Sequence, residues 1–240
     1  MLNNKLNAFI LCLISSCSFD LLAAVRLDRT RLIFPSDESS VTIKAVNASK
    51  SSPYLLKSWI ENAEGKKIAS PFTIAPSLQR IEPLATNLLR VNALIDTDSL
   101  PKDRESLFWF NIQEIPQVHE LQGGGFQFAQ KTRIKMFWRP ASLENLKAER
   151  WEDLLTLQEQ TGGFVIHNPT PFYITVTSIK NSEKSDPNPD IRATMIAPKS
   201  EAFMKSERTL TPHVTTINDY GALITTRYTC ERSTCIAKFN

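Results

Sequence analysis

The sequence predicts an all-β protein made of two β-sandwich domains. Short runs with the alternation or composition of β-strands recur along the whole chain. Prolines and glycines separate these runs as turns, and one stretch alone, residues 142–149, has helical composition. Many short strands joined by turns are typical of sandwiches or barrels and not of a parallel sheet.

The N-terminal residues 1–23 have the pattern of a secretory leader. Lys5 precedes an apolar run at 8–14, and apolar and small residues follow at 21–24. The apolar run is well short of the roughly 20 residues that a membrane-spanning helix needs. We therefore expect cleavage between Ala23 and Ala24, export and a soluble mature chain, with a retained N-terminal anchor as the alternative.

A first series of strands is expected before residue 140. Residues 40–46 alternate between apolar and polar side chains, as a half-buried strand does. Residues 54–60 are a further candidate, and residues 106–112 are apolar enough for a strand buried on both faces. Turn-forming residues at 62–65 and several prolines separate these runs.

A second series of strands is expected after residue 140. Its members are residues 163–167, 172–179, 192–196, 213–217 and the pair 222–230 and 235–239. The stretch of helical composition separates the two series. The sequence therefore predicts two domains, residues 24–140 and 141–240, each of a size typical of one sandwich.

Cysteine usage predicts one structural disulfide. Removal of the leader removes Cys12 and Cys17, which leaves Cys230 and Cys235. Two cysteines five positions apart in an exported protein are expected to be oxidised. Their spacing is not C-x-x-C and no histidine lies nearby in the sequence, which disfavours a redox or metal pair.

Charge and motifs give no sign of catalysis or of nucleic-acid binding. The 28 Lys and Arg residues against 25 Asp and Glu give a net charge of +3, too mild and too dispersed for a nucleic-acid partner. The three histidines are far apart, and no H-E-x-x-H, G-x-S-x-G or phosphate loop is present. We expect no enzyme, no metal and no cofactor; a secreted hydrolase on a β scaffold is the alternative.

One amphipathic strand, residues 125–139, stands out. In its first half Phe126 and Phe128 lie on one side, and its second half concentrates four basic residues. Taken alone, the pattern favours ordinary core packing of the two phenylalanines. The remainder of the chain gives this strand a second interpretation.

Blocks of sequence along almost the whole mature chain occur in a fixed order. They are residues 24–34 (AVRLDRTRLIF), 53–61 (PYLLKSWIE), 79–83 (QRIEP), 100–108 (LPKDRESLF), 110–116 (FNIQEIP), 132–140 (TRIKMFWRP), 168–173 (NPTPFY), 217–221 (INDYG) and the closing cysteine pair. In these blocks the sequence resembles the periplasmic pilus chaperone family, the PapD-like proteins. The resemblance implies two immunoglobulin-like sandwiches set in an L or boomerang, in agreement with the two series of strands.

The resemblance also implies a function. Such a chaperone lends an edge strand to a pilin subunit whose own sandwich lacks one, which is peptide recognition by strand addition. Residues 126–135 match the family's donor strand, with Phe126 and Phe128 filling the subunit's groove. Gln130 stands where a third apolar residue would be expected.

Two basic residues match the positions that anchor the subunit's C-terminal carboxylate in the cleft between the domains. They are Arg31 and Lys135, and a chain end that leaves water requires such charge-assisted partners. Lys135 does not share the parity of Phe126 and Phe128. We therefore expect a bend, a bulge or a crossing into the cleft to reorient it.

Three charged residues, Glu105, Arg139 and Asp219, match a cluster that lies between the domains in the family. We expect them to form a paired network that fixes the interdomain angle, since unpaired burial would be costly; unrelated surface charges are the alternative. The implied partners are pilin subunits and an outer-membrane usher, without nucleotide or metal. A self-capping homodimer of the unliganded chain stays open, and a secreted structural subunit or adhesin is the rival function.

Overall fold

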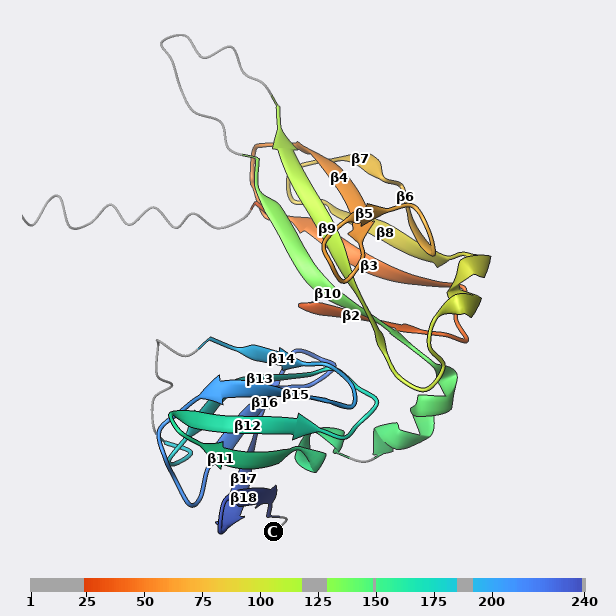
Figure 1. Cartoon of the computed structure of the whole chain (residues 1–240). Coiled ribbons are helices and arrows are strands. Elements are labelled where there is room, and N and C mark those ends of the chain that lie inside the picture. Colours follow the sequence, from red (N-terminus) through yellow and green to blue (C-terminus); the bar gives the residue numbers. More distant parts are fainter. Residues whose placement is uncertain (1–23, 118–128, 149, 185–191, 239–240) are drawn as a thin grey trace, which may run out of the picture.

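The computed structural model describes residues 24–117, 129–148, 150–184 and 192–238. The leader, Phe126 and Phe128 lie outside these ranges. Two groups of strands are set at an angle to each other and joined by a short helical connection, which gives the molecule the shape of an L (Figure 1). Helical residues in the described ranges are all 3-10, and no helix there is long and apolar enough to cross a membrane.

The N-terminal domain contains two sheets. The first has the order β1-β3-β8-β6, and its strands are β1 (Val25–Leu27), β3 (Ser40–Asn47), β8 (Thr86–Ala93) and β6 (Phe72–Ala75). The second has the order β2-β10-β9-β4-β5, with β7 paired to β4; its strands are β2 (Arg31–Pro35), β10 (Lys131–Arg139), β9 (Ser106–Pro116), β4 (Tyr54–Glu61), β5 (Lys67–Ile68) and β7 (Leu78–Ile81). A 3-10 helix, η1 (Ile95–Ser99), follows β8.

Alternation of apolar side chains places the core between these two sheets. In β3, Ile43 is buried while its neighbours Thr42 and Lys44 are exposed, and Ile43 pairs across the ladder with buried Leu89 of β8. Each fully buried aliphatic side chain of this kind contributes about 1.5–3 kcal/mol. The predicted strand at 106–112 is the first part of β9, which pairs with β4 on one side and β10 on the other.

Three phenylalanines close the N-terminal core. The ring of Phe72 lies 5.1 Å from that of Phe34 and 4.8 Å from that of Phe108, measured between centroids. The three side chains come from β6, β2 and β9, so the cluster joins the two sheets. The cluster thus packs β2, which pairs with β10, against the other sheet.

The C-terminal domain is a single sheet folded over on itself. Its order is β14-β13-β16-β17-β18-β11-β12-β15, and its strands are β14 (Thr194–Ile196), β13 (Ile174–Lys180), β16 (His213–Ile217), β17 (Leu223–Glu231), β18 (Thr234–Ala237), β11 (Thr156–Gln160), β12 (Gly163–Asn168) and β15 (Ser200–Lys205). The first half of β17 pairs with β16 and the second half with β18, so this strand passes from one layer to the other. Phe164, Val176, Val214 and Tyr228 fill the space between the layers.

Two short 3-10 helices connect the domains. They are η2 (Ala141–Ala148) and η3 (Trp151–Leu154), and η2 covers the stretch whose composition is helical. The predicted disulfide between Cys230 and Cys235 is confirmed: the two residues face each other in the β17–β18 ladder.

Removing the disulfide tests its contribution to the C-terminal domain. The double variant Cys230→Ala, Cys235→Ala is expected to lower that domain's free energy of unfolding by about 2 kcal/mol, because the cross-link restricts the unfolded chain over a short loop. Urea unfolding followed by hydrogen-exchange mass spectrometry measures the two domains separately. An unchanged midpoint for β11–β18 would contradict the expectation.

Candidate functional site between the domains

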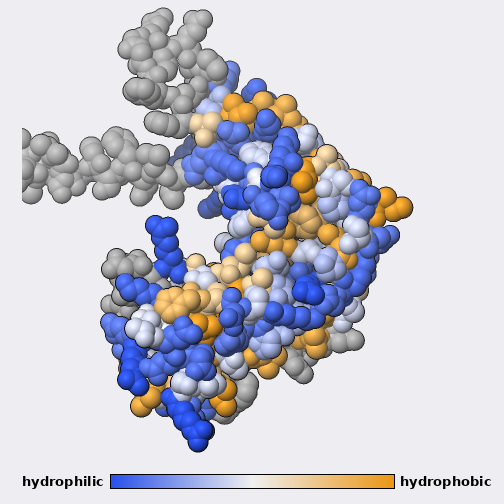
Figure 2. All heavy atoms as spheres, in the orientation of Figure 1, coloured by the Kyte–Doolittle hydropathy of each residue, from blue (hydrophilic) through white to orange (hydrophobic). Residues whose placement is uncertain are grey.

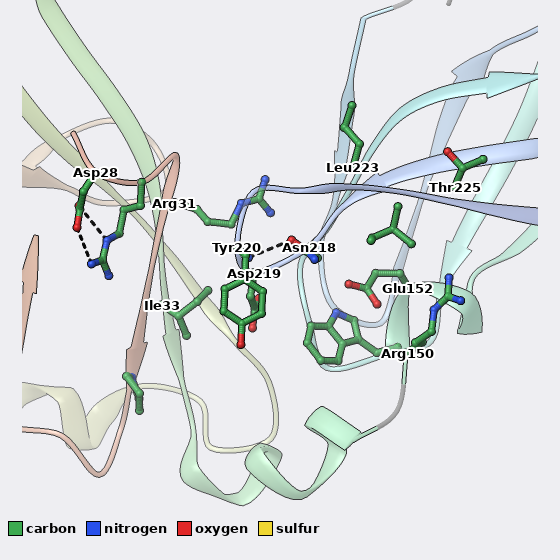
Figure 3. Close-up of a pocket in the computed structure, with 14 residues that line it drawn as sticks. Asp28, Arg31, Ile33, Arg150, Glu152, Asn218, Asp219, Tyr220, Leu223 and Thr225 are labelled. Carbon is green, nitrogen blue, oxygen red and sulfur yellow. Dashed lines mark hydrogen bonds and ion pairs between the residues drawn. The ribbon is translucent and has the colours of Figure 1, made fainter. Parts of the chain in front are cut away.

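A cleft of about 980 Å³ separates the two domains. Figure 2 shows the molecule hollowed between the domains. Arg31 and Ile33 of β2 line the cleft from the N-terminal domain, and Asp219 and Tyr220 of the β16–β17 turn line it from the C-terminal domain. In the close-up, Arg31 points from β2 toward that turn (Figure 3).

The strand β10 has an open edge that ends at this cleft. Strand β2 runs parallel to β10, and its first paired residue is Arg31, opposite Lys135. Residues 131–134 of β10 pair with β9 on one side and with no described strand on the other. An unpaired edge of this kind presents free main-chain donors and acceptors to another chain.

Two cations stand where the open edge ends. Arg31 is 7% exposed, and its Nη1 donates a hydrogen bond to the carbonyl of Ile217 at 3.1 Å, while its buried Nε has no partner. The Nζ of Lys135 donates to Thr175 Oγ1 at 2.8 Å. Within the described part of the chain, neither cation forms an ion pair.

Burial makes both charges costly. Burial and, after it, the neighbouring Arg31 charge together lower the pKa of Lys135 to about 8. Burial also lowers the pKa of Arg31, against the opposing effect of Asp219 and Glu105. A buried and a half-buried cation side by side form a site that favours an incoming anion.

The expectation that a bend, a bulge or a crossing reorients Lys135 can be compared with the structure only over residues 131–138. The β10–β9 register runs without a shift from Lys131↔Gln113 to Trp138↔Ser106, so no bulge turns the side chain. Ile134 and Met136 are buried in the N-terminal core, and Lys135 lies on the opposite face by simple alternation. That opposite face is the one that meets the C-terminal domain.

The three predicted interdomain charges lie together. Arg139 is 1% exposed; its Nε donates to Glu105 at 2.8 Å, and its Nη1 and Nη2 donate to the two carboxylate oxygens of Asp219 at 2.6 and 2.8 Å. Glu105 also accepts a 2.7 Å hydrogen bond from the main-chain N–H of Tyr173. Arg139 and Glu105 belong to the N-terminal domain, and Asp219 and Tyr173 to the C-terminal domain, so every one of these bonds to Asp219 or Tyr173 crosses the interface.

Opposing effects act on the pKa values of this network. Burial raises the pKa of Glu105 to about 7, although the charge of Arg139 and the N–H of Tyr173 favour the ionised form. For Arg139, burial would lower the pKa, but hydrogen bonds and charge from Asp219 and Glu105 raise it above its usual value. The guanidinium therefore stays charged, and both carboxylates have a fixed partner.

The donor-strand residues are described in part. Gln130 is exposed, and its carbonyl accepts a 3.0 Å hydrogen bond from the N–H of Glu114. Phe126 and Phe128 lie outside the described residues. Sequence reasoning missed Thr175, Tyr173 and the carbonyl of Ile217, because these partners act only through the approach of the second domain.

Two family models match the chain. Residues 24–144 match the model described as pili and flagellar-assembly chaperone, PapD N-terminal domain. Residues 150–228 match the model for the pili assembly chaperone PapD, C-terminal domain. The chain belongs to this family of pilus assembly chaperones, whose members are assembly proteins and not enzymes.

Individual relatives agree with the family. The chaperone protein PapD of Escherichia coli is 42% identical over 217 residues, which cover 90% of each chain. The chaperone protein PmfD of Proteus mirabilis is 35% identical over 219 residues, 89% of this chain and 86% of the relative. The crystal structure of the periplasmic chaperone SfaE superposes with a TM-score of 0.70 at 36% identity, over 85% of this chain and 98% of its own. The predicted fold class and family are confirmed.

The interdomain network can be tested by removing its cation. Arg139→Leu is expected to lower the free energy of unfolding by about 3–5 kcal/mol, because Glu105 is then a buried carboxylate without a counter-charge. Adding Glu105→Gln should recover part of the loss. The control Arg104→Leu removes an exposed pair with Asp103 and should cost less than about 1 kcal/mol. Equal losses for Arg139→Leu and Arg104→Leu in urea titrations would contradict the assignment.

Proposed function

We propose that this chaperone captures pilin subunits in the periplasm by pairing their edge with the open edge of β10, and then passes them to an outer-membrane usher. The observation that carries the proposal is the meeting of an unpaired strand edge and two unpaired cations at one point, Arg31 opposite Lys135. Main-chain hydrogen bonds along the edge supply affinity, and the cations supply a terminus-specific contact.

The geometry gives the incoming strand a direction. A client strand that extends β2 toward residue 131 lies beside the open half of β10. Its C-terminal carboxylate reaches Arg31 and Lys135 only if the strand runs toward them, which makes it parallel to β10. Each charge-assisted hydrogen bond to that carboxylate contributes about 1.5–3 kcal/mol.

The groove-filling residues follow from the same alternation. Counting by two from buried Ile134 toward the N-terminus passes Thr132 and reaches Gln130, Phe128 and Phe126. We propose that these three residues are the ones that fill the groove of a client subunit, because they share the sequence parity of Ile134. A subunit with an incomplete sandwich would then bury them in its own core, with the amide of Gln130 as the polar member of the row.

The charge network of Arg139, Glu105 and Asp219 lies next to the cation site and joins the two domains there. Arg139, Glu105 and Asp219 join the domains at the end of β10, while Thr175 and Ile217 of the second domain hold Lys135 and Arg31. We propose that the network fixes the interdomain angle at which these contacts form. We place the domain boundary at residue 140, directly after β10. We also propose that the unliganded chain can form a homodimer in which the open edge of one copy covers that of the other.

Removing the cations tests the capture of subunits. The variants Arg31→Ala and Lys135→Ala are each expected to reduce capture about tenfold or more, because each contact to the client carboxylate is worth about 1.5–3 kcal/mol. The measurement is copurification of subunits with the tagged chaperone from periplasmic extract, with mass spectrometry to identify them. Lys44→Ala, an exposed lysine on the other sheet, is the matched control. Undiminished capture by the Arg31→Ala, Lys135→Ala double variant would overturn the proposal.

The pH dependence of binding tests Lys135 separately. Its pKa is about 8 in the free protein, and a bound carboxylate would favour the protonated form. Affinity should therefore be constant below pH 8 and fall above it, by at most about tenfold for each pH unit. Fluorescence anisotropy with a peptide that ends in the C-terminal sequence of a copurified subunit measures this. Lys135→Arg should flatten the profile above pH 8, since Arg keeps its charge there; a flat profile for the unaltered protein would contradict the role of Lys135.

A further inference from the structure

A cluster of charged and aromatic side chains covers the outer face of the second N-terminal sheet. It contains Trp59 and Glu61 of β4, Trp109 of β9, and Lys131 and Arg133 of β10, and we call it the β10 clasp. Glu61 lies at its centre, 6% exposed. Its two oxygens accept contacts of 3.0 Å from Lys131 Nζ and 3.0 Å from Arg133 Nη2, and one of them also accepts a 2.8 Å hydrogen bond from Trp59 Nε1.

The two tryptophans complete the clasp. Lys131 Nζ lies 4.9 Å from the ring centroid of Trp59, and the guanidinium carbon of Arg133 lies 4.0 Å from that of Trp109. Burial would raise the pKa of Glu61, but hydrogen bonds from Trp59 and Lys131 and the nearby charges hold it below its usual value. Glu61 is therefore ionised at neutral pH, and each cation is held between a carboxylate and an aromatic face.

The position of the clasp connects it to the open edge. Lys131 and Arg133 are the outward-facing residues of the part of β10 that lacks a second partner strand. Trp109 stands directly opposite Lys135 in the β9–β10 ladder and directly opposite Glu61 in the β4–β9 ladder. One row of side chains thus runs across the sheet from Glu61 through Trp109 to Lys135.

A strand bonded on one side has half the main-chain contacts of a central strand, so its open part is prone to fraying. Side-chain contacts to β4, two strands away, oppose this. We propose that Glu61 is a positioning residue that holds the open half of β10 in an extended, ready-to-pair conformation. This inference rests on the proposed capture function. A β10 edge that is already extended lowers the cost of ordering the strand when a client binds.

The first test needs no client. Glu61→Gln removes the charge but keeps the shape of the side chain, and we expect hydrogen exchange at residues 131–134 of the free protein to accelerate about tenfold, with the urea midpoint nearly unchanged. Glu82→Gln is the control, because it removes an exposed ion pair with Arg80 on the same domain. Unaltered exchange at 131–134 in Glu61→Gln would overturn the inference.

The second test measures the effect on capture. With a subunit copurified from periplasmic extract as the probe, Glu61→Gln should weaken binding about fivefold, while exchange at 131–134 in the bound state matches that of the unaltered protein. Arg133→Gln should weaken binding similarly, and the double variant should be little worse than either single one, as expected for one interacting pair. Full affinity in Glu61→Gln, beside lost capture in the Arg31→Ala, Lys135→Ala variant, would sink the clasp but leave the capture function standing.

Discussion

The buried guanidinium of Arg139 is the contact on which the functional geometry depends. It joins a carboxylate of its own domain, Glu105, to one of the other domain, Asp219. A charge removed so completely from water is tolerated only when its partners are fixed. Because those partners come from both domains, separation of the two sandwiches at this point would break both hydrogen bonds between Arg139 and Asp219. In the proposed function, these bonds fix the angle between the domains and with it the shape of the cleft.

Arg31 and Lys135 differ from Arg139 in that no described carboxylate forms an ion pair with either of them. Arg31 is buried and Lys135 is half-buried, and burial lowers the pKa of both. The same interface thus contains one satisfied set of charges and one unsatisfied set. In the proposed function, the first set fixes the angle between the domains, and the second set binds the negatively charged end of a client chain. The proposed role of the clasp around Glu61 is to hold the strand that leads to this second set.

Alternation in the sequence was enough to predict the strands that line a core, and too little for polar or terminal ones. β3 was predicted close to its observed bounds because its apolar residues recur at every second position, and β4 and β16 were also predicted close to theirs. The first seven residues of β9 were predicted from their apolar composition, and its last four were not. β11 and β15 are largely polar and were missed, and β8 was missed although Leu89 and Val91 alternate. The site residues came from the family resemblance. Their partners Thr175, Tyr173 and the carbonyl of Ile217 could not be predicted, since only the approach of the second domain brings them into contact.

The start of β2 at Arg31 has a consequence for the register in which a client strand pairs with β10. In the proposed binding mode, a client strand that lies end to end with β2 is positioned by its own last residue, because its terminal carboxylate stops at Arg31 and Lys135. In a pleated sheet, a slip of one position turns every side chain to the wrong face. The cation pair would thus set the register of the bound client strand, and with it which of the client's residues point inward.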